Sequence, residues 1–441
     1  MLKTSYIKSK EFIILFSIII IGAFIRFASI SVNSLWTDEI ATIQYSTGTI
    51  YNIAFGYMMN GEFNPPLFYL FESIMITLGG VSEFTLRFLP SIFGLLTIPI
   101  VYLISKELTK NKNLSYLNTF IFTILPFNIY YSIEARCYTL ALLLFTVGFY
   151  YYTKEDYKKS FIFFILLTWT HFFGFIFILP LLIHYLMTKR SAKLPVLYAL
   201  GIAPLLIPLY NMLLLKSSSD VGWGLNWSEI LIQYFTEIGG MNIISGVILF
   251  LLFFSGLLLY KNTQIKLMFL LPLVITPLLT FFLNISTRYL IYFIPFYIIM
   301  ITYPLLHIKT KKFNEKQIYT ILIIFLFIPG CYAACDENKI DYRSSAQYLE
   351  NNSLNETQII IMPITREGCL THYYKGDMTV LSFAPYDLDS LKNNISKNTW
   401  IVKTGVAEYT NGNDAVSNYL NKNCTKIKEF NLISIYKYNS V

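Results

Sequence analysis

A succession of long apolar stretches, separated by short polar segments, is the feature that most constrains how this chain folds. A helix needs roughly 20 apolar residues to cross a bilayer, and the 441 residues contain eleven candidate spans. They are residues 12–30, 88–105, 114–130, 139–152, 161–170, 172–187, 194–215, 241–260, 267–283, 289–307 and 317–333. Apolar types make up 55% of the chain and charged types 14%, against about 25% charged in soluble domains. The sequence therefore predicts a polytopic α-helical membrane protein and excludes fibrous, disordered and disulfide-scaffold classes.

Basic residues alternate along the chain and predict how these spans are oriented. Eighteen lysines and arginines fall in segments that the alternation assigns to the cytoplasm, including Lys3, Lys8 and Lys10. The short outer segments hold four, namely Arg87, Arg136, Lys216 and Arg288. We therefore expect an integral plasma-membrane protein with a cytoplasmic N-terminus. The net charge of +8 is explained by the basic cytoplasmic segments, and no nucleic-acid partner is expected.

Two segments allow alternatives. The outer loop 31–86 has no Lys or Arg, and its apolar part, 66–78, has thirteen residues, or about 20 Å of helix. We expect a helix at the outer membrane surface, capped by Asn64; a true span is the alternative, and would place 106–112 outside. Residues 160–187 predict two short spans joined near His171, with one long helix as the alternative.

From residue 334 onward, long apolar spans give way to alternating helix and strand patterns. We expect 1–333 to form the membrane domain and 334–441 a small extracytoplasmic α/β domain. A helix opened by an Asp cap is predicted over 341–351, and strands over 358–363, 378–383, 400–405 and 430–438.

Four of the five cysteines fall in or beside this tail. Disulfides among Cys331, Cys335, Cys369 and Cys424 are expected in an oxidising space, with three pairings open. Buried unpaired thiols are the alternative, and the spacing is poor for zinc.

Acidic residues on the outer side are the first candidates for chemistry. Asp38 and Glu39 are adjacent carboxylates just past the first span. Their repulsion helps keep one pKa high enough for a general base, and their oxygens suit a divalent cation. A helix cap at Thr37 or Asp38 is the alternative. The prolines of the following motif, Glu62-Phe63-Asn64-Pro65-Pro66-Leu67, fix a rigid start to the surface helix. The alternative is that the motif only marks the boundary of that helix and has no functional role.

Outer arginines are the second group. Arg136, with Glu134 two residues before it, joins two spans; its planar fork suits a phosphate, and a local ion pair is the alternative. Arg87 and Arg288, the latter followed by Tyr289, each lie at an outer span end. Snorkelling is common for such arginines, but three of them outside indicate a shared anionic ligand. His171 is a further candidate for this site, and a purely structural histidine is the alternative.

Five motifs in order carry a family resemblance: Leu-Trp-x-Asp-Glu, Asn-Pro-Pro-Leu-x-Tyr, Arg-Phe-Leu-Pro-Ser-x-Phe-Gly, Tyr-Ser-x-Glu-Ala-Arg-x-Tyr and Arg-Tyr-Leu, between residues 35 and 290. Together they resemble the polyprenyl-phosphate-dependent glycosyltransferases of the GT-C fold. That superfamily includes protein O-mannosyltransferases and the aminoarabinose transferase acting on lipid A. The closest match is to the prokaryotic group called dolichyl-phosphate-mannose-protein-mannosyltransferase-like, and the tail resembles the soluble domain that often ends such chains.

The resemblance implies inverting transfer of a sugar from a polyprenyl-phosphate donor within the bilayer to a protein, lipid or glycan acceptor on the outer face. Asp38 matches the catalytic acidic position, with Glu39 beside it. Arg87, Arg136 and Arg288 match positions near the donor phosphate, Glu134 matches a loop glutamate, and Tyr289, His171 and Asn64 are further substrate-binding candidates. A divalent cation, Mg²⁺ or Mn²⁺, is left open, with Asp38 as its ligand.

The chain departs from its relatives at one motif position. Protein mannosyltransferases carry His-Pro-Pro where this chain has Asn64-Pro65-Pro66, and the aminoarabinose transferase commonly has Lys there. The acceptor is therefore not predicted, and a metal ligand at Asn64 is not expected. A lipid-linked oligosaccharide polymerase or ligase is the nearest alternative. A flippase or transporter would need mid-membrane polar residues and repeated halves.

Overall fold

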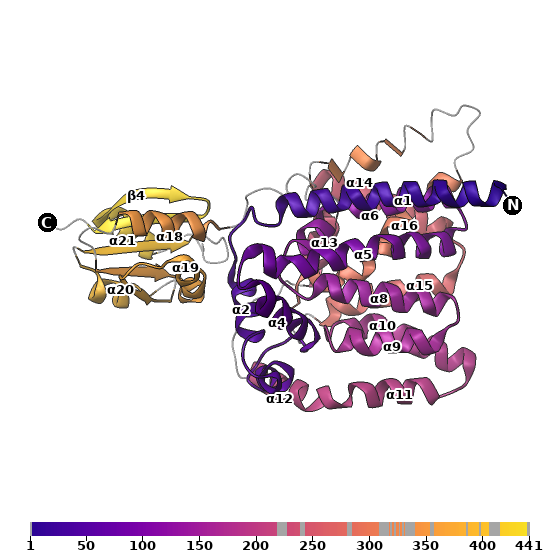
Figure 1. Ribbon diagram of the computed structural model, residues 1–441, viewed down its shortest axis with the longest axis horizontal. Coiled ribbons are helices and arrows are strands. Elements are labelled where there is room, and N and C mark those ends of the chain that lie inside the picture. Colours follow the sequence, from indigo (N-terminus) through magenta and orange to yellow (C-terminus); the bar gives the residue numbers. More distant parts are fainter. Residues whose placement is uncertain are drawn as a thin grey trace. The chain divides into compact units, whose positions relative to one another are not determined.

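The computed structural model describes residues 2–217, 227–238, 243–279, 285–307, 340–352, 357–384, 387–396, 398–404 and 415–438, with scattered residues between 317 and 330. The chain divides into two units (Figure 1). The membrane unit comprises residues 1–29 and 45–335. The second unit, here called the tail unit, comprises residues 336–441 together with residues 30–44. Each is described by itself.

The membrane unit is helical. Its helices are α1 (Leu2–Ser29), α3 (Tyr57–Met59), α4 (Leu67–Gly79), α5 (Glu83–Thr109), α6 (Lys112–Ile124), α7 (Pro126–Ser132), α8 (Tyr138–Thr153), α9 (Tyr157–Thr168), α10 (Gly174–Lys189), α11 (Lys193–Ile202), α12 (Leu206–Ser217), α13 (Trp227–Ile238), α14 (Ile243–Leu259), α15 (Thr263–Leu279) and α16 (Ile294–Thr302). Shorter turns are η1 (Asn52–Gly56), η2 (Ala203–Leu205), η3 (Thr287–Phe293) and η4 (Tyr303–Leu306). Three helices begin at N-cap residues. The side chains of Ser82, Asn111 and Asp156 accept hydrogen bonds from backbone N–H groups in the first turns of α5, α6 and α9, respectively.

Helices occupy the described parts of the first ten predicted spans, although the extended residue Leu125 divides 114–130 into α6 and α7. Most of 317–333 lies outside the described residues. By length and apolarity, four described stretches can cross a membrane: Lys10–Ser29, Glu83–Thr109, Lys193–Asn211 and Thr287–Leu306. The bent pair Leu231–Ile238 and Ile243–Leu259 makes a fifth if it counts as one span. The chain is thus a helical membrane protein, and eleven spans and their orientation stay predictions.

Both ambiguous segments are helical, and the position of 66–78 at the membrane surface stays a prediction. Residues 160–187 form two helices, α9 and α10, with a break at 169–173, so the prediction of a pair is confirmed. The stretch predicted as a surface helix is α4, which has thirteen residues. The backbone N–H of Leu67 donates to the carbonyl of Trp169 at 3.0 Å, which ties the start of α4 to that break.

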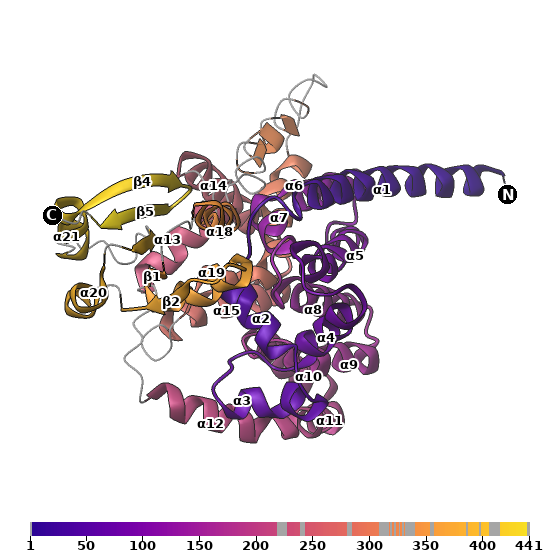
Figure 2. The same ribbon diagram turned by 60° about the vertical axis from the view of Figure 1, so that its left-hand side comes forward.

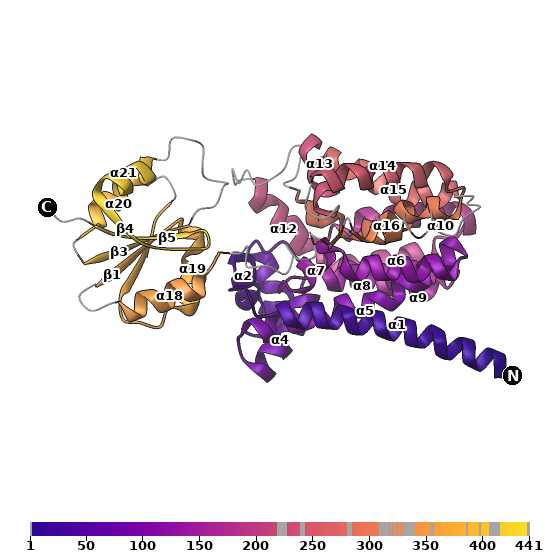
Figure 3. The same ribbon diagram turned by 90° about the horizontal axis from the view of Figure 1, so that it is seen from above.

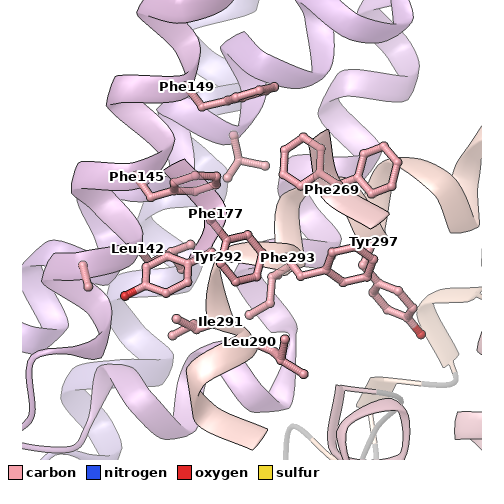
Figure 4. Close-up of a cluster of buried hydrophobic side chains, with 14 of the residues drawn as sticks. Leu142, Phe145, Phe149, Phe177, Phe269, Leu290, Ile291, Tyr292, Phe293 and Tyr297 are labelled. Carbon is pink, nitrogen blue, oxygen red and sulfur yellow. The ribbon is translucent and has the colours of Figure 1, made fainter. Parts of the chain in front are cut away.

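An aromatic core joins α8, α10 and α15 to η3 (Figure 4). The ring of Phe145 lies 5.8 Å from Phe177 and 5.5 Å from Tyr292, centre to centre. Phe149 lies 5.0 Å from Phe269. Such edge-to-face pairs add about 0.5–1.5 kcal/mol each beyond the area they bury. This packing fixes η3, and with it Arg288 and Tyr289, which precede Tyr292.

The tail unit has a five-stranded sheet in the order β2-β1-β3-β5-β4. Its strands are β1 (Gln358–Met362), β2 (Thr379–Ser382), β3 (Thr399–Thr404), β4 (Cys424–Phe430) and β5 (Ile433–Tyr438). Strands β1, β2 and β3 pair in parallel, whereas β5 is antiparallel to β3 and to β4. Strands are therefore present at all four predicted positions, and β4 is an additional one.

Helices cover both faces of this sheet (Figure 3). α18 (Tyr342–Asn351) and α19 (Glu367–Tyr373) pack on one face; α20 (Leu388–Asn394) and α21 (Ala415–Asn423) pack on the other. The Asp341 carboxylate accepts the N–H of Ser344 at 3.0 Å, so the predicted Asp cap is present.

The described cysteines do not pair with one another. Cys137, Cys369 and Cys424 are free, buried thiols. Cys369 and Cys424 belong to the hydrophobic clusters on opposite faces of the sheet, so the pairing that joins these two, one of the three left open by the sequence, is not formed. Cys331 and Cys335 lie outside the described residues.

Candidate active site

The connection between α7 and α8 carries the motif Glu134-Ala135-Arg136 and is held by α5. The Ser91 hydroxyl donates to the Ser132 carbonyl at 2.8 Å. A Cβ on Gly94, one turn further, would lie 2.4 Å from Ser132 Oγ, so only glycine permits this approach. The Pro-Ser-x-Phe-Gly motif therefore packs α5 against the residues that present Arg136.

Arg136 is buried and contacts a hydrogen-bonded group at the start of α4. Its Nη1 donates to Tyr69 Oη at 3.5 Å, and that hydroxyl donates to Glu62 Oε1 at 2.6 Å. Asn64 donates to the same Glu62 oxygen through its backbone N–H at 3.0 Å and its Nδ2 at 2.9 Å. The Cys137 thiol lies 3.6 Å from Asn64 Oδ1. The Asn-Pro-Pro-Leu-x-Tyr motif thus builds a buried carboxylate network beside Arg136.

Arg288, in η3, lies over two aromatic rings. Its guanidinium carbon is 5.5 Å from the ring centre of Tyr138 and 6.0 Å from that of Tyr289. Stacking on aromatic faces orients the planar guanidinium and leaves its edge for other contacts. The adjacent Thr287 hydroxyl donates to Glu237 Oε2 at 2.6 Å, which links η3 to α13.

His171 lies in the break between α9 and α10 and joins the same cluster. Its ring centre is 5.7 Å from that of Tyr138 and 5.2 Å from that of Tyr289, and its Nδ1 is 2.7 Å from Tyr292 Oη. Burial, and then the positive charges of Arg136 and Arg288, lower the pKa of His171 to about 3. His171 is therefore neutral at physiological pH and acts as a hydrogen-bonding ring.

We call Arg136, Tyr138, His171, Arg288 and Tyr289 the basic aromatic cluster. Arg87 and Glu134 are also buried, with 1% and 0% of their surface exposed. Arg87 lies one turn before Ser91 on α5, and therefore on the same helix face. That face packs on the connection that contains Glu134.

Asp38 and Glu39 belong to the tail unit. They lie in the first turn of α2 (Thr37–Tyr45), where carboxylates favour the positive end of the helix dipole. Glu39 is fully buried, and its Oε2 accepts the N–H of Trp36 at 3.3 Å. Asp38 is half-buried, and its carbonyl accepts the Thr42 hydroxyl at 3.1 Å. Glu39 therefore caps its own helix, whereas Asp38 is the more accessible of the two.

The structure thus brings Arg136, Arg288, His171, Tyr289 and, through Tyr69 and Glu62, Asn64 into one region of the membrane unit. The sequence analysis did not identify Tyr69 and Tyr138 as site residues, and it discussed Glu62 only as part of a helix boundary. Both tyrosines end a motif that carries the resemblance, so a signal for them was present. Their partners, however, come from distant parts of the chain.

The sequence left open a divalent cation with Asp38 as its ligand. Among the described residues, no group of three or more His, Cys, Asp or Glu side chains could hold a metal ion.

Three solved structures resemble this chain across most of its length. ArnT from Cupriavidus metallidurans, bound to undecaprenyl phosphate, aligns with a TM-score of 0.56 and 9% identity over 95% of this chain and 97% of that one. The same ArnT in the apo state aligns with a TM-score of 0.56 and 9% identity over 99% of this chain and 98% of that one. The oligosaccharyltransferase of Archaeoglobus fulgidus, tethered to an acceptor peptide containing the NVT sequon, gives a TM-score of 0.54 and 13% identity over 90% of this chain and 69% of its own.

No family model and no curated protein matches the chain by sequence. At these low identities the likeness establishes the fold and not the activity. The five motifs resembled those of GT-C glycosyltransferases, and the fold that this resemblance implied is confirmed: this chain has the GT-C fold.

Proposed function

We propose that this protein is an inverting glycosyltransferase that moves a sugar from a polyprenyl-phosphate donor to an acceptor hydroxyl on the outer face of the membrane. The observation that carries the proposal is the basic aromatic cluster, in which two arginines from distant segments converge on Tyr138 and His171. Buried positive charge in a membrane protein is costly and usually marks a functional site.

Arg136 and Arg288 are proposed to bind the donor phosphate. Each guanidinium offers a planar set of N–H donors that matches two phosphate oxygens. The Tyr138 and Tyr289 rings hold Arg288 in one plane, and Tyr69 holds Arg136. The undecaprenyl phosphate named in the ArnT structure is a ligand of this chemical class. Arg87 and Glu134 are proposed to line the same region.

The transfer needs one base and one stabilised leaving group. An acceptor hydroxyl oxygen attacks the anomeric carbon from the face opposite the phosphate, its proton passes to a carboxylate, and the bond between that carbon and the phosphate oxygen breaks. Polyprenyl phosphate leaves with the bonding electron pair, and the anomeric configuration inverts. Negative charge grows on the phosphate in this step, so the arginines stabilise the transition state more than the bound donor.

Asp38 is proposed as the base, because it is a half-buried carboxylate at the position that the resemblance marks as catalytic. Glu39 is proposed to support it, since its carboxylate is used to cap α2. The acceptor is a protein, lipid or glycan, and the reaction will identify it.

The test uses purified protein in lipid, radiolabelled polyprenyl-phosphate hexose and a membrane extract of acceptors. Wild type should move label to a new product and Asp38→Asn should not, while Asp389→Asn, the same change at an exposed site on α20, should match wild type. Full activity in Asp38→Asn would remove Asp38 as the base. Transfer of a whole lipid-linked glycan, or its movement across the membrane, without use of any monophosphate donor would favour a polymerase or flippase instead.

A further inference from the structure

The segment that carries the acidic motif is bonded to residues more than 300 positions away in the tail unit. The Ser34 hydroxyl donates to the Ile340 carbonyl at 2.6 Å and accepts the Tyr342 N–H at 3.1 Å. The guanidinium of Arg343 donates to the Ser31 carbonyl at 3.2 Å. These bonds fix the chain just before the motif to the start of α18.

A second set of contacts reaches the motif itself, where α2 lies beside α19 (Figure 2). The backbone N–H of Leu35 donates to Tyr373 Oη at 2.7 Å. Arg366 donates to Thr37 Oγ1, and the Cys369 thiol lies 3.6 Å from the same oxygen. Each contact therefore acts on the residues that immediately precede Asp38.

The residues that make these contacts are buried. Hydrogen bonds that are shielded from water are stronger than exposed ones. Leu35 is fully buried, and Arg366 and Cys369 are 6% and 1% exposed. Burial raises the pKa of Cys369 to about 11, so the thiol is neutral and serves as a weak hydrogen-bonding partner of Thr37. Ile40 packs on the hydrophobic cluster beneath α18 and α19, and its Cγ2 lies 3.3 Å from where a Cβ on Gly368 would be. The first turn of α2 is thus held by backbone, hydroxyl and apolar contacts together.

We propose that α19 and the turn before it are a positioning element of the catalytic motif: Arg366, Cys369 and Tyr373 hold Leu35 and Thr37, and thereby set the direction in which Asp38 points. This inference rests on the proposed function, in which Asp38 is the base. A tail unit that served only as a cover would need no bonds to the two residues around Trp36. Arg366 and Tyr373 touch neither donor nor acceptor in this proposal.

Two matched pairs of variants test it. Thr37→Val removes the hydroxyl that Arg366 and Cys369 contact while keeping the side-chain shape, and Thr37→Ser keeps the hydroxyl. Tyr373→Phe removes the acceptor for the Leu35 N–H. Its control is Tyr348→Phe on α18, whose ring packs on Trp400 and Phe430 within the same unit.

Amide hydrogen exchange and steady-state kinetics are measured on the full chain in lipid nanodiscs. Thr37→Val and Tyr373→Phe should speed exchange over residues 35–42 and lower kcat about tenfold or more, because small misplacements of a catalytic group cost up to about 100-fold. The Kd for polyprenyl phosphate should stay within twofold of wild type, since the proposed phosphate ligands belong to the membrane unit. Thr37→Ser and Tyr348→Phe should match wild type in both measurements.

Three results would overturn the inference. Wild-type kcat in both Thr37→Val and Tyr373→Phe would show that the contacts do not position the base. An equal loss in Tyr348→Phe would show that general destabilisation of the tail unit is responsible. A weaker Kd with unchanged kcat would place the effect in donor binding. If wild type itself transfers no sugar, the proposed function fails and the catalytic part of the inference fails with it, while the exchange data still report separately whether the contacts hold the motif.

Discussion

Replacing Arg288 with glutamine gives the sharpest test of the donor site. Gln keeps polar character and part of the aliphatic stem, but it is shorter and lacks the charge and the planar fork that lies over Tyr138 and Tyr289. A hydrogen bond to a charged group contributes about 1.5–3 kcal/mol, and each 1.4 kcal/mol is a factor of ten in Kd. Loss of one such contact should therefore raise the Kd for polyprenyl phosphate roughly 10- to 150-fold. Arg288→Lys keeps the charge without the fork and should fall between wild type and Gln.

The assay is equilibrium binding of polyprenyl phosphate, without sugar, to protein in nanodiscs, so that it reports affinity and not turnover. Two lost cation–π contacts should also lower stability, by about 0.5–2 kcal/mol each, and melting is therefore recorded on the same samples. Arg190→Gln, the same change at an exposed site after α10, is the control. A Kd for Arg288→Gln within twofold of wild type, in protein that is still folded, would refute the assignment of Arg288 to the phosphate.

Three further predictions concern the residues around the cluster. Tyr69→Phe removes a buried hydroxyl from the Glu62 carboxylate and should cost about 1.5–3 kcal/mol of stability and weaken donor binding, as thermal melting and donor titration will show; unchanged melting and affinity would contradict the network. His171 has a folded pKa of about 3 against 6.5 unfolded, so the unfolded state binds more protons below pH 6.5. Stability should be insensitive to His171 above pH 6.5 and fall as pH drops from 6.5 toward 3, by at most about 1.4 kcal/mol per pH unit; His171→Gln should flatten this part of the melting profile, and a profile unchanged by that substitution would argue against a buried neutral ring. Gly94→Ala places a methyl group 2.4 Å from Ser132 Oγ and should destabilise by about 1–3 kcal/mol, with a lower melting temperature than wild type; equal melting would mean that α5 does not approach Ser132 this closely.

Polar contacts that link sequence-distant residues explain why some site residues were not predicted. Tyr69 reads locally as one aromatic residue of an apolar helix, and nothing in that helix indicates a contact with Arg136, which lies 67 positions later. No local pattern reports a hydroxyl that bridges a carboxylate and a guanidinium across that distance.

The strand β4 shows the same limit in the tail unit. Residues 424–430 are mostly exposed and include Lys426, Lys428 and Glu429, so they lack the apolar alternation that predicts a strand. Their strand conformation comes from antiparallel pairing with β5, which has buried residues on both faces of the sheet and was predicted.

The sequence by itself determined the membrane class, the helices, most strands of the tail and the motifs, because apolar content, periodicity and capping act over a few residues. Tertiary structure alone decided which motif residues meet. It gathered Arg136, His171 and Arg288 around Tyr138, and it bonded the residues beside Asp38 to Arg366 and Tyr373. Those contacts join segments tens to hundreds of residues apart, and their partners are chosen by the packing of whole helices and of the sheet, which no short stretch of sequence encodes.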